Sequence, residues 1–127
     1  MVPKELLYTK DHEWVRLEDG RARVGITDHA QKSLGDIVYV ELPPVGKEVK
    51  KGEKTATVES VKAVGEVFAP LSGKVVEVNT TVTQSPDLIN KDPYGQGWLF
   101  VLEISDRAEI GSLLAPEAYE ELLKGGG

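Results

Sequence analysis

The chain has 127 residues with a formal net charge of −6 and no cysteine, and 40% of its residues are hydrophobic. This length and content predict one domain with one modest core, and the net negative charge argues against nucleic acid, whose phosphates favour clusters of Lys and Arg. The absence of cysteine excludes disulfides, thiolate metal sites and a cysteine nucleophile, so any thiol chemistry requires an attached group.

Short runs rich in β-branched and other apolar residues predict β-strands along most of the chain. The predicted strands are residues 13–17, 21–27, 36–42, 55–58, 64–69, 73–78 and 98–104. Apolar Ala22, Val24 and Ile26 alternate with polar or small residues, as in a strand with one buried face. Many short strands with few helices predict a mainly β fold, as an antiparallel sandwich or a flattened barrel.

The first predicted helix is short and internal, over residues 28–34. Asp28 is expected to cap its N-terminus, with Gln31 in the capping-box position, and Gly35 suits its C-terminal end.

A second helix is predicted near the C-terminus, over residues 116–124. Pro116 suits its first turn, and Ala118, Leu122 and Leu123 are expected to form its apolar side. A shorter turn is expected at 109–114. We therefore expect a single domain over residues 1–127, with its core at about 10–105 and its C-terminal helix at about 116–124.

The most informative segment is Glu-Ser-Val-Lys-Ala at residues 59–63. Its lysine, Lys62, lies between two Val-rich predicted strands, at the expected turn of a β-hairpin. The neighbours Ser60, Val61 and Ala63 are small or apolar, whereas a purely solubilising turn more often carries Asn-Gly or Asp-Gly. Lys62 is therefore interpreted either as an attachment point that another enzyme can reach or as an ordinary solvated lysine.

The remaining chemistry-bearing residues favour structural interpretations. His12 and His29 are expected to be hydrogen-bonded structural groups, and Trp14 and Trp98 core residues. No His, Asp and Glu cluster has metal-ligand spacing, and no glycine-rich phosphate loop or nucleophile motif is present. These patterns argue against an enzyme.

Segments in one order along the chain carry a family resemblance. They are HEWV at 12–15, GITDHAQ at 25–31, LGDIV at 34–38, VELP at 40–43, ESVKA at 59–63, LIN at 88–90 and GW at 97–98. In these segments the chain resembles the H proteins of the glycine cleavage system, over nearly its whole length. The resemblance implies a lipoyl-domain-like barrel-sandwich hybrid of two antiparallel sheets, with lipoic acid amide-linked to Lys62.

The resemblance also implies a carrier rather than a catalyst. The lipoyl group would shuttle an aminomethyl unit from glycine decarboxylase (P protein) to aminomethyltransferase (T protein) and be reoxidised by dihydrolipoyl dehydrogenase (L protein). A lipoylating enzyme would be a further partner. We expect a monomer that binds neither nucleic acid nor membrane, in the cytoplasm or, for an organellar form, the mitochondrial matrix, because no signal peptide or apolar run of ~20 residues is visible.

Family likeness extends to residues around Lys62. Glu59 is expected to serve recognition by the lipoylating enzyme, with solubility as the alternative, and Gly46 and Gly73 match the spacing of the glycine pair in lipoylated and biotinylated domains. A cleft that shelters the loaded arm needs acidic or polar groups. The candidates are Glu13, Ser33 and Glu66.

Other classes remain open from the sequence alone. The lipoyl domain of an acyltransferase usually shows Asp-Lys-Ala, and a biotin carrier domain Met-Lys-Met, where this chain has Val61-Lys62-Ala63. An H-like protein that relays lipoyl groups to other proteins, and an unmodified interaction module, are further alternatives.

Overall fold

Two antiparallel sheets form the body of the protein, in a computed structural model that describes residues 2–125. The larger sheet has the strand order β1-β2-β3-β9-β8-β5, and the smaller one has the order β4-β6-β7. The larger sheet contains β1 (Leu7–Tyr8), β2 (Glu13–Glu18), β3 (Arg21–Ile26), β5 (Glu48–Val49), β8 (Gly73–Val78) and β9 (Phe100–Ile104). The smaller contains β4 (Ile37–Glu41), β6 (Lys54–Ser60) and β7 (Val64–Phe68). Residues 1, 126 and 127 of the predicted domain lie outside the described residues.

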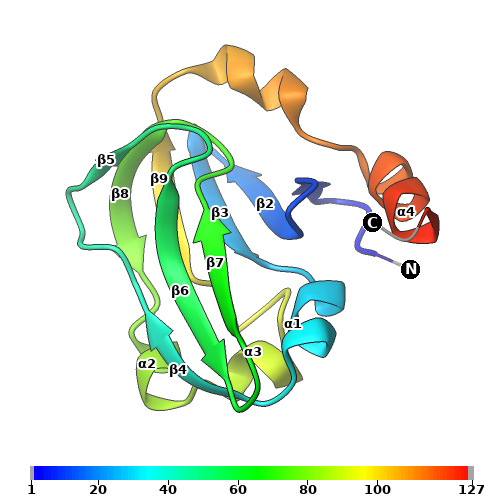
Figure 1. Ribbon diagram of the computed structural model, residues 1–127. Helices are drawn as coiled ribbons and strands as arrows, with labels where there is room; N and C mark the ends of the chain where they lie inside the picture. Colours follow the sequence, from blue (N-terminus) through cyan, green and yellow to red (C-terminus); the bar gives the residue numbers. More distant parts are fainter. Residues whose placement is uncertain (1, 126–127) are drawn as a thin grey trace.

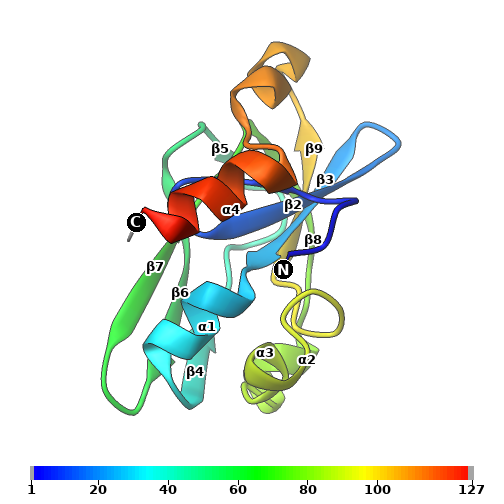
Figure 2. The same cartoon turned by 90° about the vertical axis from the view of Figure 1, so that its right-hand side faces the viewer.

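The two sheets face each other and enclose the main core (Figures 1 and 2). Val24 and Leu102 of the larger sheet are fully buried, as is Val58 of the smaller one. Each sheet keeps two edge strands, so the layers stay open rather than closing into a barrel. The prediction of a mainly β fold of two antiparallel sheets is confirmed.

The alternation predicted for β3 holds, apart from Gly25. Ala22, Val24 and Ile26 are buried, and Gly25 on the opposite face is buried too, because it pairs with Trp14 and lies under that side chain. A Cβ at Gly25 would lie 2.6 Å from the indole atoms Cε2 and Cζ2 of Trp14. The close approach of the indole explains the glycine.

Several short elements escaped prediction. These are β1 and β5, of two residues each, and the one-turn helices α2 (Thr81–Gln84) and α3 (Leu88–Lys91). The turn expected at 109–114 is the 3₁₀ helix η1 (Arg107–Ser112). Elements this short carry too few residues for a periodic pattern, and β1 and β5 exist through their pairing with β2 and β8.

The internal helix α1 (Asp28–Leu34) has the predicted bounds but a different cap. Thr27 is the N-cap, and its hydroxyl accepts the N–H of Ala30 at 3.3 Å. Asp28 lies in the first turn and accepts the side-chain amide of Gln31 at 2.8 Å, so the predicted capping box is wrong by one residue. Gly35 ends the helix as predicted, at φ 85°.

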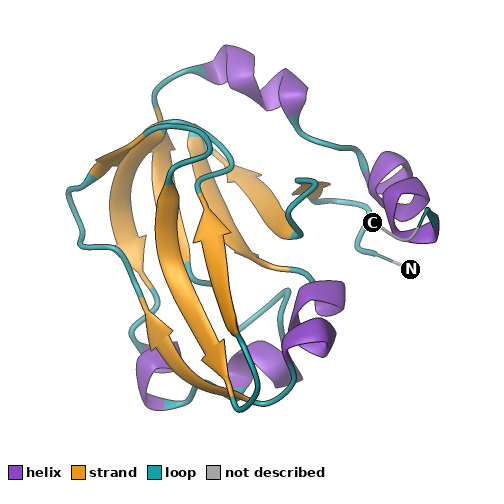
Figure 3. Ribbon diagram, viewed as in Figure 1, coloured by secondary structure: helices purple, strands orange, loops and turns teal. Residues whose placement is uncertain are grey.

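The C-terminal helix α4 (Pro116–Lys124) also has the predicted bounds, and it packs beside β1 at the edge of the larger sheet (Figure 3). Tyr119 is its buried residue, whereas Ala118, expected on the apolar side, is exposed. The Tyr119 ring stacks on Tyr8, with centroids 4.7 Å apart and planes 7° from parallel. Leu122 and Leu123 pack partly buried against this cluster, which also contains Leu6 and Trp14.

The two tryptophans differ in burial. Trp14 is fully buried and donates its indole N–H to the carbonyl of Pro93 at 2.9 Å. Trp98 is only half-buried, and the guanidinium of Arg23 lies 4.4 Å from its ring centroid. The core prediction therefore holds fully for Trp14 and in part for Trp98, which packs against the cluster of Leu6, Tyr8, Trp14 and Tyr119 and also takes a cation–π contact.

Candidate functional site

Lys62 lies in the turn between β6 and β7, at the hairpin tip that the sequence predicted (Figure 1). The hydroxyl of Ser60 accepts the backbone N–H groups of Lys62 at 3.2 Å and Ala63 at 3.0 Å, and the Ser60 N–H donates to the carbonyl of Ala63 at 2.8 Å. One serine thus closes the turn. Lys62 is exposed and forms no ion pair among residues 2–125.

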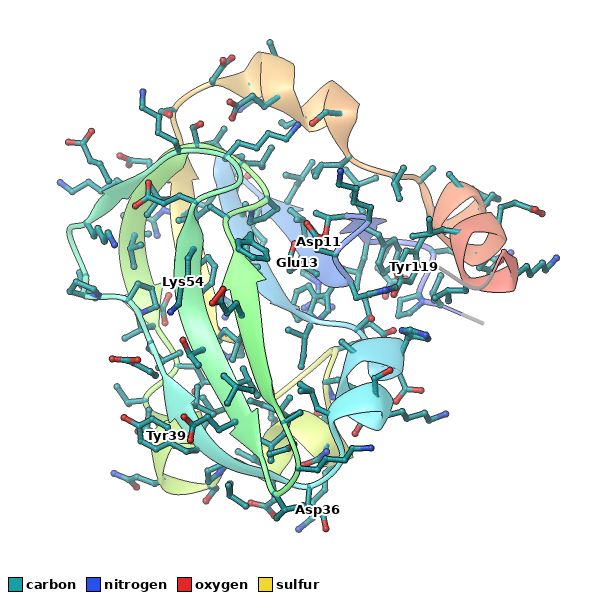
Figure 4. All side chains as sticks on the ribbon, in the orientation of Figure 1. Asp11, Glu13, Asp36, Tyr39, Lys54 and Tyr119 are labelled. Carbon is teal, nitrogen blue, oxygen red and sulfur yellow. The ribbon has the colours of Figure 1, made fainter. Side chains whose placement is uncertain are left out.

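The tip rests on the connection between α1 and β4. The N–H of Val61 donates to the carbonyl of Asp36 at 3.1 Å, and a Cβ on Gly35 would lie 3.4 Å from Cε of Lys62. Figure 4 shows Asp36 at the same end of the molecule as this turn. The lysine stem therefore runs beside the Gly35 backbone.

Apolar side chains are exposed around the lysine. Val61 and Val64 flank the turn at 71% and 62% exposure, and Val38 and Tyr39 lie on the neighbouring edge strand β4 at 54% and 52%. Within the described part of the chain, most of the large exposed apolar side chains thus lie near Lys62. The surface is suited to contact with enzymes that must reach the tip.

A cleft of about 390 Å³ opens between α1, β2 and β7, beginning three residues beyond Lys62 at Gly65. Its lining residues are Asp11, His12, Glu13, Ile26, His29, Ala30, Ser33, Leu34, Val58, Gly65, Glu66 and Val67. The three residues proposed from the sequence for an arm cleft, Glu13, Ser33 and Glu66, all line it. The structure thus brings them together from separate elements.

Glu13 is the deepest polar group of the cleft, with 2% of its surface exposed. Its carboxylate accepts the hydroxyl of Thr9 at 2.6 Å and the backbone N–H of Phe68 at 3.1 Å. Burial raises the pKa of Glu13 to about 7, and the nearby charge of Asp11 also raises it, against the two hydrogen bonds that lower it. Near neutral pH, both protonation states of this carboxyl are populated.

A second hollow, of about 260 Å³, lies beyond Glu13 and shares Glu13 and Asp11 with the first. Phe68, Ala69, Pro70 and two leucines before α4 give it an apolar floor, with Lys10 and Lys51 also in the lining. Figure 4 shows Asp11 and Glu13 side by side between the hairpin and the C-terminal part of the chain. The two hollows therefore adjoin at Asp11 and the buried carboxyl of Glu13.

Sequence reasoning missed Asp11, His12 and His29 as cleft residues. The imidazoles lie 4.4 Å apart, and Nδ1 of His12 shares a 2.8 Å hydrogen bond with the hydroxyl of Tyr119. Burial lowers the pKa of His12, and the neighbouring His29 lowers it further. Nδ1 of His29 is buried without a hydrogen-bond partner among the described residues. Both histidines belong to the segments that carry the family resemblance. That membership is the only sequence feature that could have indicated their place in the cleft.

The other predicted residues lie in different places. Glu66 is exposed at the rim, with its carboxylate 3.7 Å from Nζ of Lys54, and Ser33 is exposed on α1. Glu59 is half-buried on β6, opposite Val64. Glu59 therefore lies beside the turn that contains Lys62.

Gly73 belongs to the larger sheet and Gly46 lies in the turn before β5 of that sheet, whereas Glu59 is in the smaller sheet. Gly46 precedes β5 at φ 97° and donates its N–H to the carbonyl of Val75 at 2.7 Å. Gly73 begins β8, paired with Val49 and Ile104. The structure does not place this pair beside Lys62.

Among residues 2–125, no helix is long and apolar enough to cross a membrane, and no three His, Cys, Asp or Glu side chains are grouped to hold a metal ion.

An exposed lysine at a hairpin tip of the smaller of two open sheets, near a cleft with a buried carboxyl, defines a carrier of the lipoyl-domain type. The chain belongs to the glycine cleavage H-protein family, whose model matches residues 6–126. The glycine cleavage system H protein of Thermotoga maritima is 63% identical over 114 residues, 90% of this chain and 92% of that protein. The one from Carboxydothermus hydrogenoformans is 55% identical over 124 residues, 98% of this chain and 95% of that protein.

A solved structure agrees with this family membership. The crystal structure of a glycine cleavage system H protein from Mycobacterium marinum matches with a TM-score of 0.89 at 42% identity, covering 99% of this chain and 100% of that one. The predicted family and lipoyl-domain-like fold are confirmed. Members of this family carry lipoic acid covalently on a lysine, and the chain is a lipoyl-carrying subunit of the glycine cleavage system rather than a catalyst.

Proposed function

We propose that Lys62 is the residue that carries the lipoyl group. The observation that supports this most is its position at the exposed tip of a hairpin, in the ESVKA segment, with its stem directed past Gly35 and a cleft opening at Gly65. An exposed amine that forms no ion pair with any residue from 2 to 125 is accessible to a modifying enzyme. The residues present therefore fit the group.

Attachment changes the electrostatics of the tip, because an amide replaces the ammonium of Lys62 and leaves a long neutral arm. The cleft wall offers that arm an apolar surface from Ile26, Leu34, Val58 and Val67. The bound group supplies a dithiolane whose sulfurs accept and release a one-carbon unit. Tethering raises the effective concentration of the sulfurs at each partner's active site.

Glu13 is proposed to hold the cationic amine of the cargo. A buried carboxyl with a pKa near 7 becomes fully ionised when a cation lies beside it, because opposite charges stabilise each other in a site of low dielectric. The burial of Glu13 also keeps water away from that amine. Ser33 and Glu66 at the rim provide further polar contacts.

Membership in the glycine cleavage system implies P, T and L proteins as partners. We further propose that a lipoylating enzyme recognises Glu59 beside the turn, with Gly46 and Gly73 contributing through the strands that they shape. We further propose that the carrier is a monomer in the cytoplasm, and the bacterial origin of these relatives supports that compartment.

The first test is an intact-mass spectrum of the protein from its own cells, with peptide mapping across residues 54–74. A lipoyl adduct on Lys62 is the expected result. A bare Lys62 in cells with active lipoylating enzymes would overturn the assignment, and a biotin adduct would indicate a carboxylase carrier. Reconstitution with a glycine decarboxylase then separates a glycine cleavage carrier from a relay that passes lipoyl groups elsewhere.

A further inference from the structure

The side-chain amide of Asn90, in α3, forms hydrogen bonds with α1 and with the connection between α1 and β4. Its Nδ2 donates to Oε1 of Gln31 at 2.8 Å and to the carbonyl of Gly35 at 2.9 Å. Its Oδ1 accepts the backbone N–H of Ile37 at 2.9 Å. This half-buried amide thus forms hydrogen bonds with the α1–β4 connection on both sides of Asp36.

That connection supports the hairpin turn. The carbonyl of Asp36 accepts the N–H of Val61, and Ile37 pairs with Ser60, the residue that closes the turn. Gly35 lies beside the stem of Lys62. A chain of contacts therefore runs from Asn90 through residues 35–37 to the lysine, although Asn90 belongs to a different segment from either.

We propose that Asn90 is a positioning residue for Lys62: it fixes the α1–β4 connection, and the connection fixes the direction in which the hairpin tip presents the lysine. The functional consequence rests on the proposed role of Lys62, whereas the mechanical coupling does not. The turn keeps the hydrogen bonds that Ser60 makes within it. Loss of the Asn90 side chain therefore frees the hairpin tip to move relative to the α1–β4 connection without opening the hairpin.

Loss of the amide leaves partners unpaired. In Asn90→Ala, the carbonyl of Gly35 and the N–H of Ile37 lose their side-chain bonds, which frees the connection to move. Asn79→Ala is the matched control, because Nδ2 of Asn79 also donates to two carbonyls, those of Gln96 at 2.8 Å and Trp98 at 2.7 Å, in the loop that precedes β9. Both variants lose a side-chain amide that donates two hydrogen bonds, and only Asn90 is linked to the hairpin tip.

Amide hydrogen exchange on the full, unmodified chain tests the coupling without any lipoyl group. After correction for global stability, the Val61 amide is expected to exchange about tenfold faster in Asn90→Ala and at the wild-type rate in Asn79→Ala. Equal rates of Val61 exchange in both variants would overturn the proposal. If Asn90→Ala does not fold, Asn90→Asp takes its place, because its carboxylate keeps the acceptor for Ile37 and lacks both donors.

The functional consequence is measured with a lipoylating enzyme and the unlipoylated variants as substrates. Asn90→Ala is expected to raise KM severalfold with kcat unchanged, and Asn79→Ala to leave both unchanged. Unchanged KM and kcat in Asn90→Ala would refute positioning. If the wild-type chain accepts no lipoyl group on Lys62, the proposed function fails, while the exchange measurement still decides the role of Asn90.

Discussion

The carboxylate of Glu13 accepts the backbone N–H of Phe68 at 3.1 Å, and this bond joins β2 of the larger sheet to β7 of the smaller one beside the cleft. The same side chain accepts the hydroxyl of Thr9, so both carboxylate oxygens are engaged. A buried acid therefore belongs both to the scaffold and to the cleft. Its protonation state links the stability of the fold to pH.

The first prediction concerns that linkage. The pKa of Glu13 is about 7 in the folded protein, above the ordinary value of 4.5, so the folded state binds the proton more tightly. The contribution of this raised pKa to the free energy of unfolding is fully present below about pH 4.5. It is lost as the pH rises to about 7, and the loss is at most about 3 kcal/mol. Glu13→Gln should remove this part of the pH dependence. Urea unfolding across that range measures it, and an unchanged slope in the variant would contradict the assigned pKa.

The second prediction concerns the cargo. Glu13→Ala should leave lipoylation of Lys62 intact but shorten the lifetime of the aminomethyl-loaded protein roughly tenfold, because the amine loses its buried charged partner. Glu66→Ala is the control, since Glu66 is exposed and faces Lys54, and a smaller effect is expected. Hydrolysis of the loaded protein followed by mass spectrometry gives both lifetimes. An unchanged lifetime would remove Glu13 from this role.

The third prediction concerns the attachment residue. Lys62→Arg should abolish lipoylation and carrier function while changing the free energy of unfolding by less than about 0.5 kcal/mol, because the side chain is exposed and unpaired within the described residues. Mass spectrometry, thermal unfolding and a coupled glycine decarboxylation assay measure the three effects. Retained decarboxylation in this variant would refute the assignment.

The fourth prediction separates the two glycines. A Cβ at Gly73 would lie 2.3 Å from the backbone oxygen of Glu103, whereas a Cβ at Gly46 meets no atom within 4 Å and is disfavoured only by φ 97°. Gly73→Ala should therefore destabilise by about 3 kcal/mol or more, and Gly46→Ala by about 1–2 kcal/mol. Urea unfolding ranks them, and equal losses would contradict the packing described for β8.

The fifth prediction concerns the docking of α4. The hydroxyl of Tyr119 lies 2.8 Å from Nδ1 of His12 and 2.7 Å from Oγ1 of Thr27. Tyr119→Phe keeps the stacking on Tyr8 and should cost about 1–2 kcal/mol, because buried Thr27 and half-buried His12 lose their shared partner. The matched control is Tyr39→Phe, at an exposed ring, which should change the free energy of unfolding by less than about 0.5 kcal/mol. Similar losses in both variants would exclude the hydroxyl as the cause.

Local patterns determined much of this protein. Alternation along residues 21–27, valine-rich runs on either side of Lys62 and the glycine after residue 34 act within a few residues, so they predicted the longer strands, the hairpin tip and α1. The family resemblance added the attachment chemistry and three candidates for the cleft, of which Glu13 lies in a family segment and Ser33 and Glu66 lie outside them.

Only the tertiary structure decided the rest, because it depends on groups distant in the chain. The burial of Glu13 requires β7 to lie beside β2, and that burial raises its pKa. The placement of His12 and His29 in the cleft depends on the packing of α1 and α4 around β2. The hydrogen bonds of Asn90 with Gly35 and Ile37 join residues that are more than 50 positions apart in the sequence. Contacts between distant segments produce no periodic pattern of residues within one segment, so no local pattern could have predicted them.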